Sequence, residues 1–281
     1  MKPTVSILAP GGMGAALAAR LVQHGVEVRT SLTNRSERSA ERARAAGMTI
    51  VNDADVLNVD FLLSVVPPKE ALALAETLAP QLKQSDRRPI YVDLNAVNPD
   101  TAVQIAGVVE DSGTPFVDGS IIGLPPKEGS AGPSLYVSGE EARKLEALSE
   151  FGLQMRVLDA PVGAASALKM SYGGITKGLI ALGSAMILGA ERAGVGDALY
   201  EEMSRTQPGL LNGFSKSIPD MFSKAARWVA EMEEISEFLG EERPQGRMFK
   251  EIGALYSHLA DDQAGDIATL ARFFEQHSAK G

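Results

Sequence analysis

Short apolar runs rich in β-branched residues alternate with helical patterns over about the first 120 residues of this 281-residue chain. Such alternation is typical of parallel strands joined by helical crossovers. The run at 60–66 (DFLLSVV) is an almost continuous apolar segment, as expected for a strand buried on both faces of a sheet. We therefore predict a doubly wound α/β sheet with strands at 5–9, 26–32, 48–51, 60–66, 90–94, 116–118, 134–137 and 155–158.

Two polar motifs mark expected helix starts in this region. Asn98 precedes Pro99, which places a capping side chain before a proline in the first helical turn. Ser138 and Glu141 have the spacing of a capping box and predict a second helix start. Other helices are expected from the glycines near residue 11 to about residue 23, at 36–46 and at 69–78.

The second half of the chain has helical periodicity, and no strand pattern follows Pro161. Residues 164–192 are expected to form one long Gly/Ala-rich helix. Lys177 and several glycines interrupt its apolar stretch, which falls short of the ~20 residues that a membrane span needs. Further helices are expected at 197–205, 219–239, 246–259 and 262–276. The sequence thus predicts an α/β domain at 1–160 and an all-α domain at 161–281, joined by the long helix.

Composition excludes several classes of function. The formal charge of −9 argues against a surface that tracks nucleic-acid phosphates. The chain has no cysteine, and its three histidines lie far apart in the sequence, so we predict no metal site and no disulfide. The N-terminus enters an apolar strand without a recognisable cleavage site, and a cytoplasmic protein with no membrane partner is expected.

A glycine-rich turn follows the first predicted strand and opens the first helix. It contains Gly11, Gly12, Met13 and Gly14, while Ala9 takes the place of the first glycine in the pattern G-x-G-x-x-G. Glycine at 11 allows backbone to approach a pyrophosphate, glycine at 14 allows close packing of helix on sheet, and the helix N-terminus attracts phosphate. The turn predicts a dinucleotide site, although an ordinary tight turn would have the same local sequence.

The end of the second predicted strand indicates which dinucleotide is bound. Asn34, Arg35 and Ser36 lie where the adenosine ribose is expected, and no acidic residue ends the strand. A carboxylate there would repel a 2′-phosphate, whereas a guanidinium can bind one through two hydrogen bonds. We therefore predict NADP(H) as the cofactor.

Several segments together resemble the β-hydroxyacid dehydrogenase superfamily, which includes 3-hydroxyisobutyrate and 6-phosphogluconate dehydrogenases and imine reductases. They occur in the family order over about residues 4–195: PGGMG, SVVPP, VDLNAVNPDT, FVDGSIIG and VGAASALKMSYGG. The resemblance implies an N-terminal Rossmann domain, a helical C-terminal domain and a homodimer that exchanges helices. Val66, Pro67 and Asn95 are further candidate cofactor-binding residues, and Asn95, which follows the fifth predicted strand, is expected to border the nicotinamide.

Two departures from the family pattern bear on the chemistry. Ile122 occupies the position where hydroxyacid dehydrogenases usually have a substrate-binding serine. The motif G-x-G-x-x-x-K-x-x-x-N retains Gly163 and Lys169, but Ala165 and Gly173 replace its second glycine and its asparagine. Imine reductases also lack the serine, but they usually replace the lysine as well.

The retained lysine is the candidate proton donor. Reduction of a carbonyl develops negative charge on oxygen and needs an acid within hydrogen-bond reach, which indicates Lys169 or, on the same helical face, Tyr172. Outside the family register, a solvated surface lysine would be the better explanation of Lys169. Candidate substrate-binding residues are Ser120, Ile122, Gly123, Thr176, Trp228 and Met232, and the last two could instead belong to a helix core.

Three functions remain open from the sequence. The leading one is an NADPH-dependent oxidoreductase that transfers a hydride between the nicotinamide and a small carbonyl or hydroxy compound. An NADPH-dependent imine reductase is the alternative favoured by Ile122. A non-catalytic NADP(H)-binding protein is the third, and it follows from the incomplete lysine motif.

Overall fold

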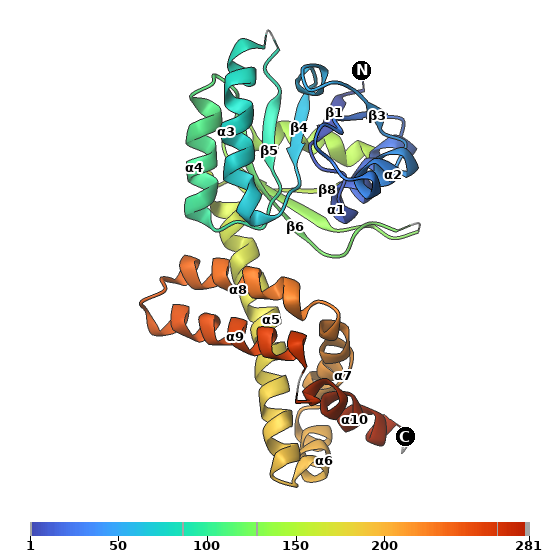
Figure 1. The fold of residues 1–281 in the computed structure, drawn as a ribbon, viewed down its shortest axis with the longest axis vertical. Coiled ribbons are helices and arrows are strands. Elements are labelled where there is room, and N and C mark those ends of the chain that lie inside the picture. Colours follow the sequence, from blue (N-terminus) through green and yellow to red (C-terminus); the bar gives the residue numbers. More distant parts are fainter. Residues whose placement is uncertain (1, 86, 128, 263, 279–281) are drawn as a thin grey trace. The chain divides into compact units, whose positions relative to one another are not determined.

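The computed structural model describes residues 2–85, 87–127, 129–262 and 264–278, with only the backbone at residue 278. The chain divides into two compact units, Met1–Met170 and Ser171–Gly281. The first unit contains the sheet and the second is helical (Figure 1).

An eight-stranded sheet forms the centre of the first unit, with strand order β3-β2-β1-β4-β5-β6-β7-β8. All neighbouring strands are parallel except β6 and β7, which are antiparallel. The first six strands have the order of a doubly wound dinucleotide-binding sheet, so the predicted fold class is confirmed. The strands are β1 (Thr4–Ile7), β2 (Glu27–Thr30), β3 (Thr49–Ile50), β4 (Phe61–Ser64), β5 (Ile90–Asp93), β6 (Phe116–Ile122), β7 (Ser134–Ser138) and β8 (Gln154–Val157).

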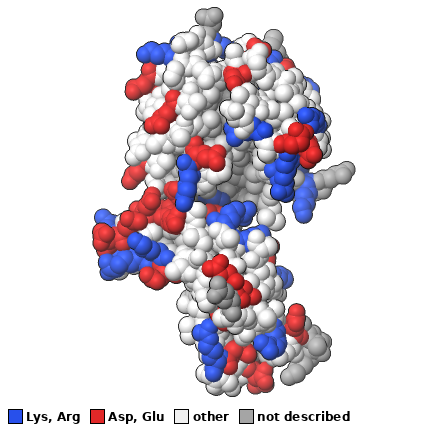
Figure 2. All heavy atoms as spheres, in the orientation of Figure 1, with Lys and Arg blue, Asp and Glu red and all other residues white. Residues whose placement is uncertain are grey.

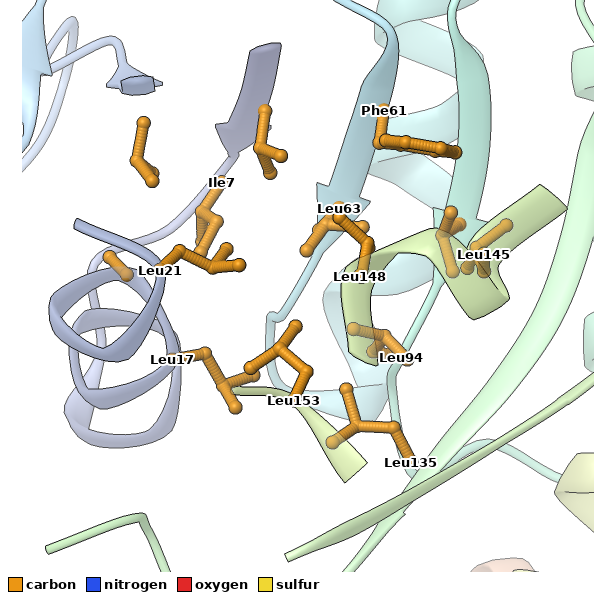
Figure 3. Packing of buried hydrophobic residues seen from close by; sticks show 14 of the residues in the cluster. Ile7, Leu17, Leu21, Phe61, Leu63, Leu94, Leu135, Leu145, Leu148 and Leu153 are labelled. Carbon is orange, nitrogen blue, oxygen red and sulfur yellow. The ribbon is translucent and has the colours of Figure 1, made fainter. Parts of the chain in front are cut away.

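Each face of the sheet has its own buried cluster. Leu63 belongs to one cluster and its neighbour Leu62 to the other, because successive side chains of a strand point to opposite faces. On the first face, Leu17 of α1 and Leu145 of η2 pack in the cluster with Leu63 (Figure 3). This face is covered by α1 (Gly12–Gln23), α2 (Glu37–Ala45) and the 3₁₀ helix η2 (Ala142–Phe151). The opposite face is covered by α3 (Pro68–Gln84) and α4 (Pro99–Glu110), and a short 3₁₀ helix, η1 (Asp55–Leu57), precedes β4.

The two predicted helix starts have different outcomes. Asn98 caps α4 as predicted, because its Oδ1 accepts the Thr101 N–H at 2.9 Å. The capping box at 138–141 is wrong. Ser138 ends β7 and donates its hydroxyl hydrogen to Asp118, and η2 begins without a side-chain cap. The strand predicted at 116–118 extends to Ile122, because β7 pairs with it along that length.

The second unit consists of the later part of α5 and five further helices. The prediction of one continuous helix at 164–192 is confirmed by α5 (Ala164–Arg192). The following helices are α6 (Gly196–Thr206), α7 (Pro208–Phe222), α8 (Ala225–Leu239), α9 (Pro244–Asp261) and α10 (Asp266–Ser278).

The helix predicted at 219–239 is wrong, because the chain breaks between Phe222 and Ala225. Buried residues recur every three or four positions through this break, and they include Leu211, Phe214, Ile218, Met221, Ala225, Trp228, Met232 and Ile235. The three- and four-residue spacing of apolar residues therefore continues from one helix into the next. This spacing alone does not indicate where the chain breaks. Pro219 lies inside α7 rather than at the start of a helix.

Within the second unit, three glycines of α5 face aromatic rings of neighbouring helices. A methyl group added at Gly174 or Gly178 would lie about 3.3–3.5 Å from the ring of Phe249 in α9. One added at Gly183 would lie 2.8 Å from the Phe214 ring of α7. The large side chains on the outer face of α5 are exposed: Ile175 by 66%, Leu179 by 44%, Leu182 by 59% and Met186 by 61%.

Among the described residues, α5 is the one helix with the length and hydropathy of a membrane span. Two lysines within it have protein partners: Lys169 donates to the Ile121 carbonyl, and Lys177 forms an ion pair with Glu231 of α8. Both lysines of α5 are therefore bound by other parts of the folded chain. Charged side chains of both signs are interspersed over the face of the molecule shown in Figure 2.

Candidate functional site

The glycine turn leaves the start of α1 open to a ligand. No side chain caps α1 and no acidic residue lies in its first turn. A methyl group at Gly14 would overlap the Ala9 carbonyl oxygen, whereas one at Gly11 or Gly12 would meet no heavy atom within 4 Å. Glycine at 14 is therefore required for packing, while the backbone at 11 and 12 faces open space. Free helix N–H groups beside open space fit a pyrophosphate.

The loop after β2 holds the residues predicted at the adenosine end. Ser36 caps α2, because its Oγ accepts the Ser39 N–H at 3.3 Å. Asn34 has a positive φ of 57°. The Arg35 guanidinium donates to the Leu8 carbonyl at 3.1 Å, which places it next to the glycine turn. These contacts bring Arg35 and the turn together, as a nucleotide spanning both would require.

Asp53 also reaches this end of the sheet, which the sequence did not indicate. It follows β3, and its carboxylate accepts the hydroxyl hydrogen of Ser31, the residue that follows β2. The prediction that no acidic residue ends the second strand is correct for the strand itself. A carboxylate is nevertheless supplied by a neighbouring loop, and it could accept a hydrogen bond from a ribose hydroxyl.

Asn95 links the ends of two central strands. Its Oδ1 accepts the Val66 N–H at 2.6 Å, and its Nδ2 donates to Ser64 Oγ at 2.9 Å. The side chain is 3% exposed, so it holds the loop after β4 in place. Pro67 follows as the residue before α3 and is exposed. Val66, Pro67 and Asn95 thus lie at adjacent strand ends, where a doubly wound sheet binds its ligands.

Asp93 is a buried carboxylate beside this link. Its Oδ1 accepts the Asn95 N–H at 2.8 Å, while its Oδ2 has no hydrogen-bond partner among the described residues. Burial raises the pKa of Asp93 to about 7, and the neighbouring charge of Asp118 acts in the same direction. Folding therefore shifts this carboxyl toward its neutral form relative to the unfolded chain.

The start of α5 is bound to β6 and β7. Asp118 accepts hydrogen bonds from Gly163 N at 2.9 Å, Ser166 N at 3.1 Å and Ser166 Oγ at 2.6 Å. Ser138 Oγ donates to Asp118 at 3.0 Å. Burial raises the pKa of Asp118, and these hydrogen bonds oppose the rise.

Lys169 lies one turn further along α5. Its Nζ donates to the Ile121 carbonyl of β6 at 2.8 Å, and the side chain is partly buried. Ser120 is fully buried and donates to the Ala165 carbonyl at 2.9 Å, so in this structure it binds α5 to the strand. Ile122 is partly buried at the end of β6, and Gly123 follows with φ 131°. The first unit thus brings together Lys169, Ser120, Ile122 and Gly123.

The other predicted substrate residues lie in the second unit. Tyr172 is 50% exposed, and Thr176 donates its hydroxyl hydrogen to the Tyr172 carbonyl at 2.9 Å. Trp228 and Met232 are 6% and 0% exposed and belong to the helix core. An ion pair between Lys177 and Glu231 lies beside Trp228, with the Lys177 ammonium 5.5 Å from the indole centroid.

Three buried or partly buried groups were not found by sequence reasoning: Asp118, Asp93 and the Lys177–Glu231 pair. The two aspartates had a signal, because each interrupts an apolar strand (YVDLN and FVDGS). An acid in a strand buried on both faces requires donors or a raised pKa. The partners come from segments up to 48 residues away, which the sequence pattern does not reveal.

Among the described residues, no group of three His, Asp or Glu side chains could hold a metal ion.

The sheet order, the open glycine turn and the polar strand ends define a Rossmann dinucleotide-binding protein. The chain belongs to the β-hydroxyacid dehydrogenase superfamily: residues 4–155 match the NAD binding domain of 6-phosphogluconate dehydrogenase. Residues 190–259 match a domain of unknown function, DUF1932.

Relatives extend over nearly the whole chain. The conserved protein MTH1747, whose structure has similarity with 3-hydroxyacid dehydrogenases, is 30% identical, with 94% of this chain and 99% of that chain covered and a TM-score of 0.76. The NADPH-dependent reductive aminase of Aspergillus oryzae is 25% identical over 300 residues and 98% of each chain. The 3-hydroxyisobutyrate dehydrogenase of Mycobacterium tuberculosis shares the fold at 18% identity, with both chains fully covered and a TM-score of 0.76. Family and relatives support an oxidoreductase that binds a nicotinamide cofactor and acts on small molecules.

The raised pKa of Asp93 predicts a pH-dependent stability. Because its folded pKa is about 7 and its ordinary value is 3.8, the carboxyl stabilises the fold fully below pH ~4 and loses that contribution as the pH rises to ~7. Asp93→Asn mimics the neutral form. We expect its melting temperature, relative to the native chain, to rise steadily between pH 4 and 7 and to level off above.

Asp266→Asn provides a control of opposite sign. The His258 and Arg192 side chains hold the pKa of Asp266 below its ordinary value, so its contribution is present above pH ~4 and is lost on further acidification. This variant is expected to melt below the native chain at pH 5, and the interval should narrow on acidification below pH ~4. Parallel melting curves for Asp93→Asn and the native chain across pH 4–7 would contradict the assignment.

Proposed function

We propose that this protein is a cytoplasmic NADPH-dependent reductase of small carbonyl compounds, with Lys169 as the general acid. The observation that carries the proposal is the hydrogen bond from Lys169 Nζ to the Ile121 carbonyl. It holds an ammonium group near the carboxyl end of β6, next to the strand that ends near Asn95. Ligands of doubly wound sheets bind at this edge.

The residues of the first unit fit the cofactor in three places. The N-terminus of α1 and the open backbone at 11–13 would hold the pyrophosphate, with Met13 on the first turn. Arg35, together with Asn34 and Ser36, would hold the 2′-phosphate. Val66, Pro67 and Asn95 would border the nicotinamide. When bound, NADPH supplies the hydride for reduction.

Lys169 would donate the proton that the reduced oxygen requires. Its Nζ donates a hydrogen bond to the Ile121 carbonyl, which orients the ammonium group at the end of β6. Tyr172 is the alternative donor, and Thr176 could help to position a substrate. Ile122 and Gly123 at the end of β6 would shape the pocket, which favours a neutral or weakly polar group there over a carboxylate.

Imine reduction is the second candidate. The relationship to the NADPH-dependent reductive aminase covers 98% of the chain, and Ile122 removes a hydroxyl that a hydroxyacid would use. An iminium arrives already protonated, so its reduction depends less on a lysine donor. The two candidates therefore differ in the expected effect of removing Lys169.

The cofactor prediction is tested at Arg35. Arg35→Ala should weaken NADPH binding by the ~1.5–3 kcal/mol typical of hydrogen bonds to charged groups, and NADH binding much less. Asp53→Ala is the matched contrast, because loss of a carboxylate should spare or improve NADPH binding and weaken NADH binding. Fluorescence titration with both cofactors measures the effects. Equal losses for both cofactors in Arg35→Ala would exclude a 2′-phosphate contact.

The proton-donor prediction is tested at Lys169. Lys169→Ala should slow reduction by the ~10²–10⁴-fold usual for general-acid catalysis, with little change in NADPH affinity. Lys169→Arg should not restore the rate, because guanidinium hardly releases a proton at neutral pH. Lys144→Ala, an exposed lysine of the same unit, is the control and should have the native rate.

The assay is NADPH oxidation with 3-oxobutanoate, cyclohexanone and 1-pyrroline, which represent keto acids, neutral ketones and cyclic imines. A small effect at Lys169 with a large one in Tyr172→Phe would favour imine reduction. If neither substitution changes the rate with any substrate, the catalytic assignment is wrong, and a non-catalytic NADP(H)-binding protein becomes the better explanation.

We also propose a homodimer that buries the outer face of α5. Ile175, Leu179, Leu182 and Met186 recur every three or four residues on this face, and α5 and α9 line an apolar groove of about 670 Å³ beside them. Exposed apolar faces of this extent mark interaction sites. Light scattering at micromolar concentration should give a dimer, and Leu182→Glu should give a monomer. A monomeric native chain would contradict the proposal.

A further inference from the structure

The first turn of α5 has no local capping side chain. The residues before it are Ala160, Pro161, Val162 and Gly163, and none of their side chains can accept a hydrogen bond. The N–H groups at the start of a helix nevertheless need acceptors when they are buried. Gly163 and Ala165 are both buried here, so the acceptors must come from elsewhere in the fold.

The sheet supplies them through one row of residues. Asp118 and Ser138 are direct partners in the antiparallel register of β6 and β7. Asp118 Oδ2 accepts the N–H groups of Gly163 and Ser166, and Ser138 Oγ accepts the N–H of Ala165 at 3.1 Å. Since Ser138 accepts from the helix, its own hydroxyl hydrogen is directed to Asp118. All four contacts to Asp118 come from donors, which is the arrangement that an ionised carboxylate requires.

The same strand then contacts α5 at two further points. Ser120 Oγ donates to the Ala165 carbonyl at 2.9 Å, and the Ile121 carbonyl accepts from Lys169 Nζ at 2.8 Å. Lys169 follows Ser166 by three residues, which is about one helical turn. A shift or fraying of the first turn would therefore move the lysine relative to the carbonyl that holds it.

We infer that Asp118 is the positioning residue of Lys169: the carboxylate fixes the start of α5 on β6 and thereby sets where the ammonium is presented. This inference rests on the proposed function only for its catalytic consequence. Asp118 binds the first turn of α5, and that turn determines the position of Lys169. These contacts do not depend on which substrate is reduced. Asp118 does not itself contact the reacting atoms in this scheme.

Asp118→Asn is the main variant. If the amide keeps its oxygen toward the N–H groups of Gly163 and Ser166, its NH₂ group faces the Ser166 hydroxyl, which must turn from donor to acceptor, and the remaining bonds lose the charge of the carboxylate. Asp60→Asn is the matched control. Asp60 also accepts several hydrogen bonds, from Thr4 N at 2.7 Å and Thr4 Oγ1 at 2.9 Å. It directly precedes β4 and so lies at the amino ends of the parallel strands, away from the carboxyl end of β6.

The first measurement is a double-mutant cycle with Lys169→Ala, using NADPH and the fastest of the three substrates named above. Asp118→Asn should lower kcat by ~10–100-fold in the native background, as expected for a misplaced catalytic group. In the Lys169→Ala background it should lower kcat less than twofold, because the group that it positions is absent. The Kd for NADPH should stay within twofold, and Asp60→Asn should leave kcat within twofold in both backgrounds.

The second measurement needs no activity and no cofactor. Acetylation by an N-hydroxysuccinimide ester, quantified by peptide mass spectrometry, reports how well Lys169 Nζ is held. The ratio of Lys169 to Lys144 labelling should rise at least threefold in Asp118→Asn and stay unchanged in Asp60→Asn. If Asp118→Asn does not fold, Ser166→Ala removes one of the four bonds and should give the same changes at smaller size.

The outcomes separate the two proposals. Increased labelling with an unchanged rate in Lys169→Ala would support the positioning by Asp118 and refute the proton-donor assignment. Unchanged labelling in folded Asp118→Asn, or equal losses of kcat in both backgrounds, would overturn the positioning inference whatever Lys169 does.

Discussion

The attachment of α5 to the sheet depends on one buried carboxylate. Asp118 is 1% exposed, and burial of an unpaired charge at such a site would be strongly unfavourable. Four donors offset that cost, and hydrogen bonds to a charged group contribute about 1.5–3 kcal/mol each. The first N–H groups of a 29-residue helix are thereby bound to β6.

The antiparallel pairing of β6 with β7 makes this attachment possible. In an all-parallel sheet each strand is followed by a crossover, whereas here β7 returns directly beside β6 and places Ser138 opposite Asp118. On the other side, Asp93 of β5 is the register partner of Asp118. The row Asp93, Asp118, Ser138 thus holds two carboxyl groups side by side. Burial raises the pKa of both groups. Asp118 has four donors that oppose the rise, whereas at Asp93 the rise is opposed by Asn95 alone, and the pKa of Asp93 rises to about 7.

Sequence reasoning succeeded where the signal is local. The alternation of strands and helices gave the sheet, Asn98 gave the cap of α4, and the glycine turn gave the open start of α1. It failed where the partner is remote. Ser138 and Glu141 have the spacing of a capping box, yet Ser138 binds a carboxylate of another strand. Asp53 reaches the end of β2 from a different loop, and the break between α7 and α8 lies within one unbroken apolar periodicity.

The composition of α5 has a physical explanation in the contacts of its later turns. An ordinary amphipathic helix buries its large apolar side chains and exposes small or polar ones. Within the second unit, α5 departs from this pattern. Gly174, Gly178 and Gly183 face the rings of Phe249 and Phe214 on the inward side, where large residues such as Ile187 are also buried, while further large apolar side chains lie outside. Each glycine lowers the stability of a helix by about 1 kcal/mol relative to alanine. Its recurrence at these inward positions is explained by the close approach of the aromatic rings, which leaves little room for a larger side chain.

The outer face of α5 has more apolar surface than a solvated helix normally presents. Lys177 does not relieve it, because its ammonium is directed to Glu231 and the Trp228 ring within the unit. The helix therefore serves two separate contacts along its length. Its first turns are fixed by polar bonds to the sheet, and its later turns pack against aromatic rings on the inward face and present large apolar side chains on the outward face. A sequence that satisfies both cannot follow a single amphipathic pattern, which explains why α5 has the hydropathy of a membrane span and yet carries two lysines in protein contacts.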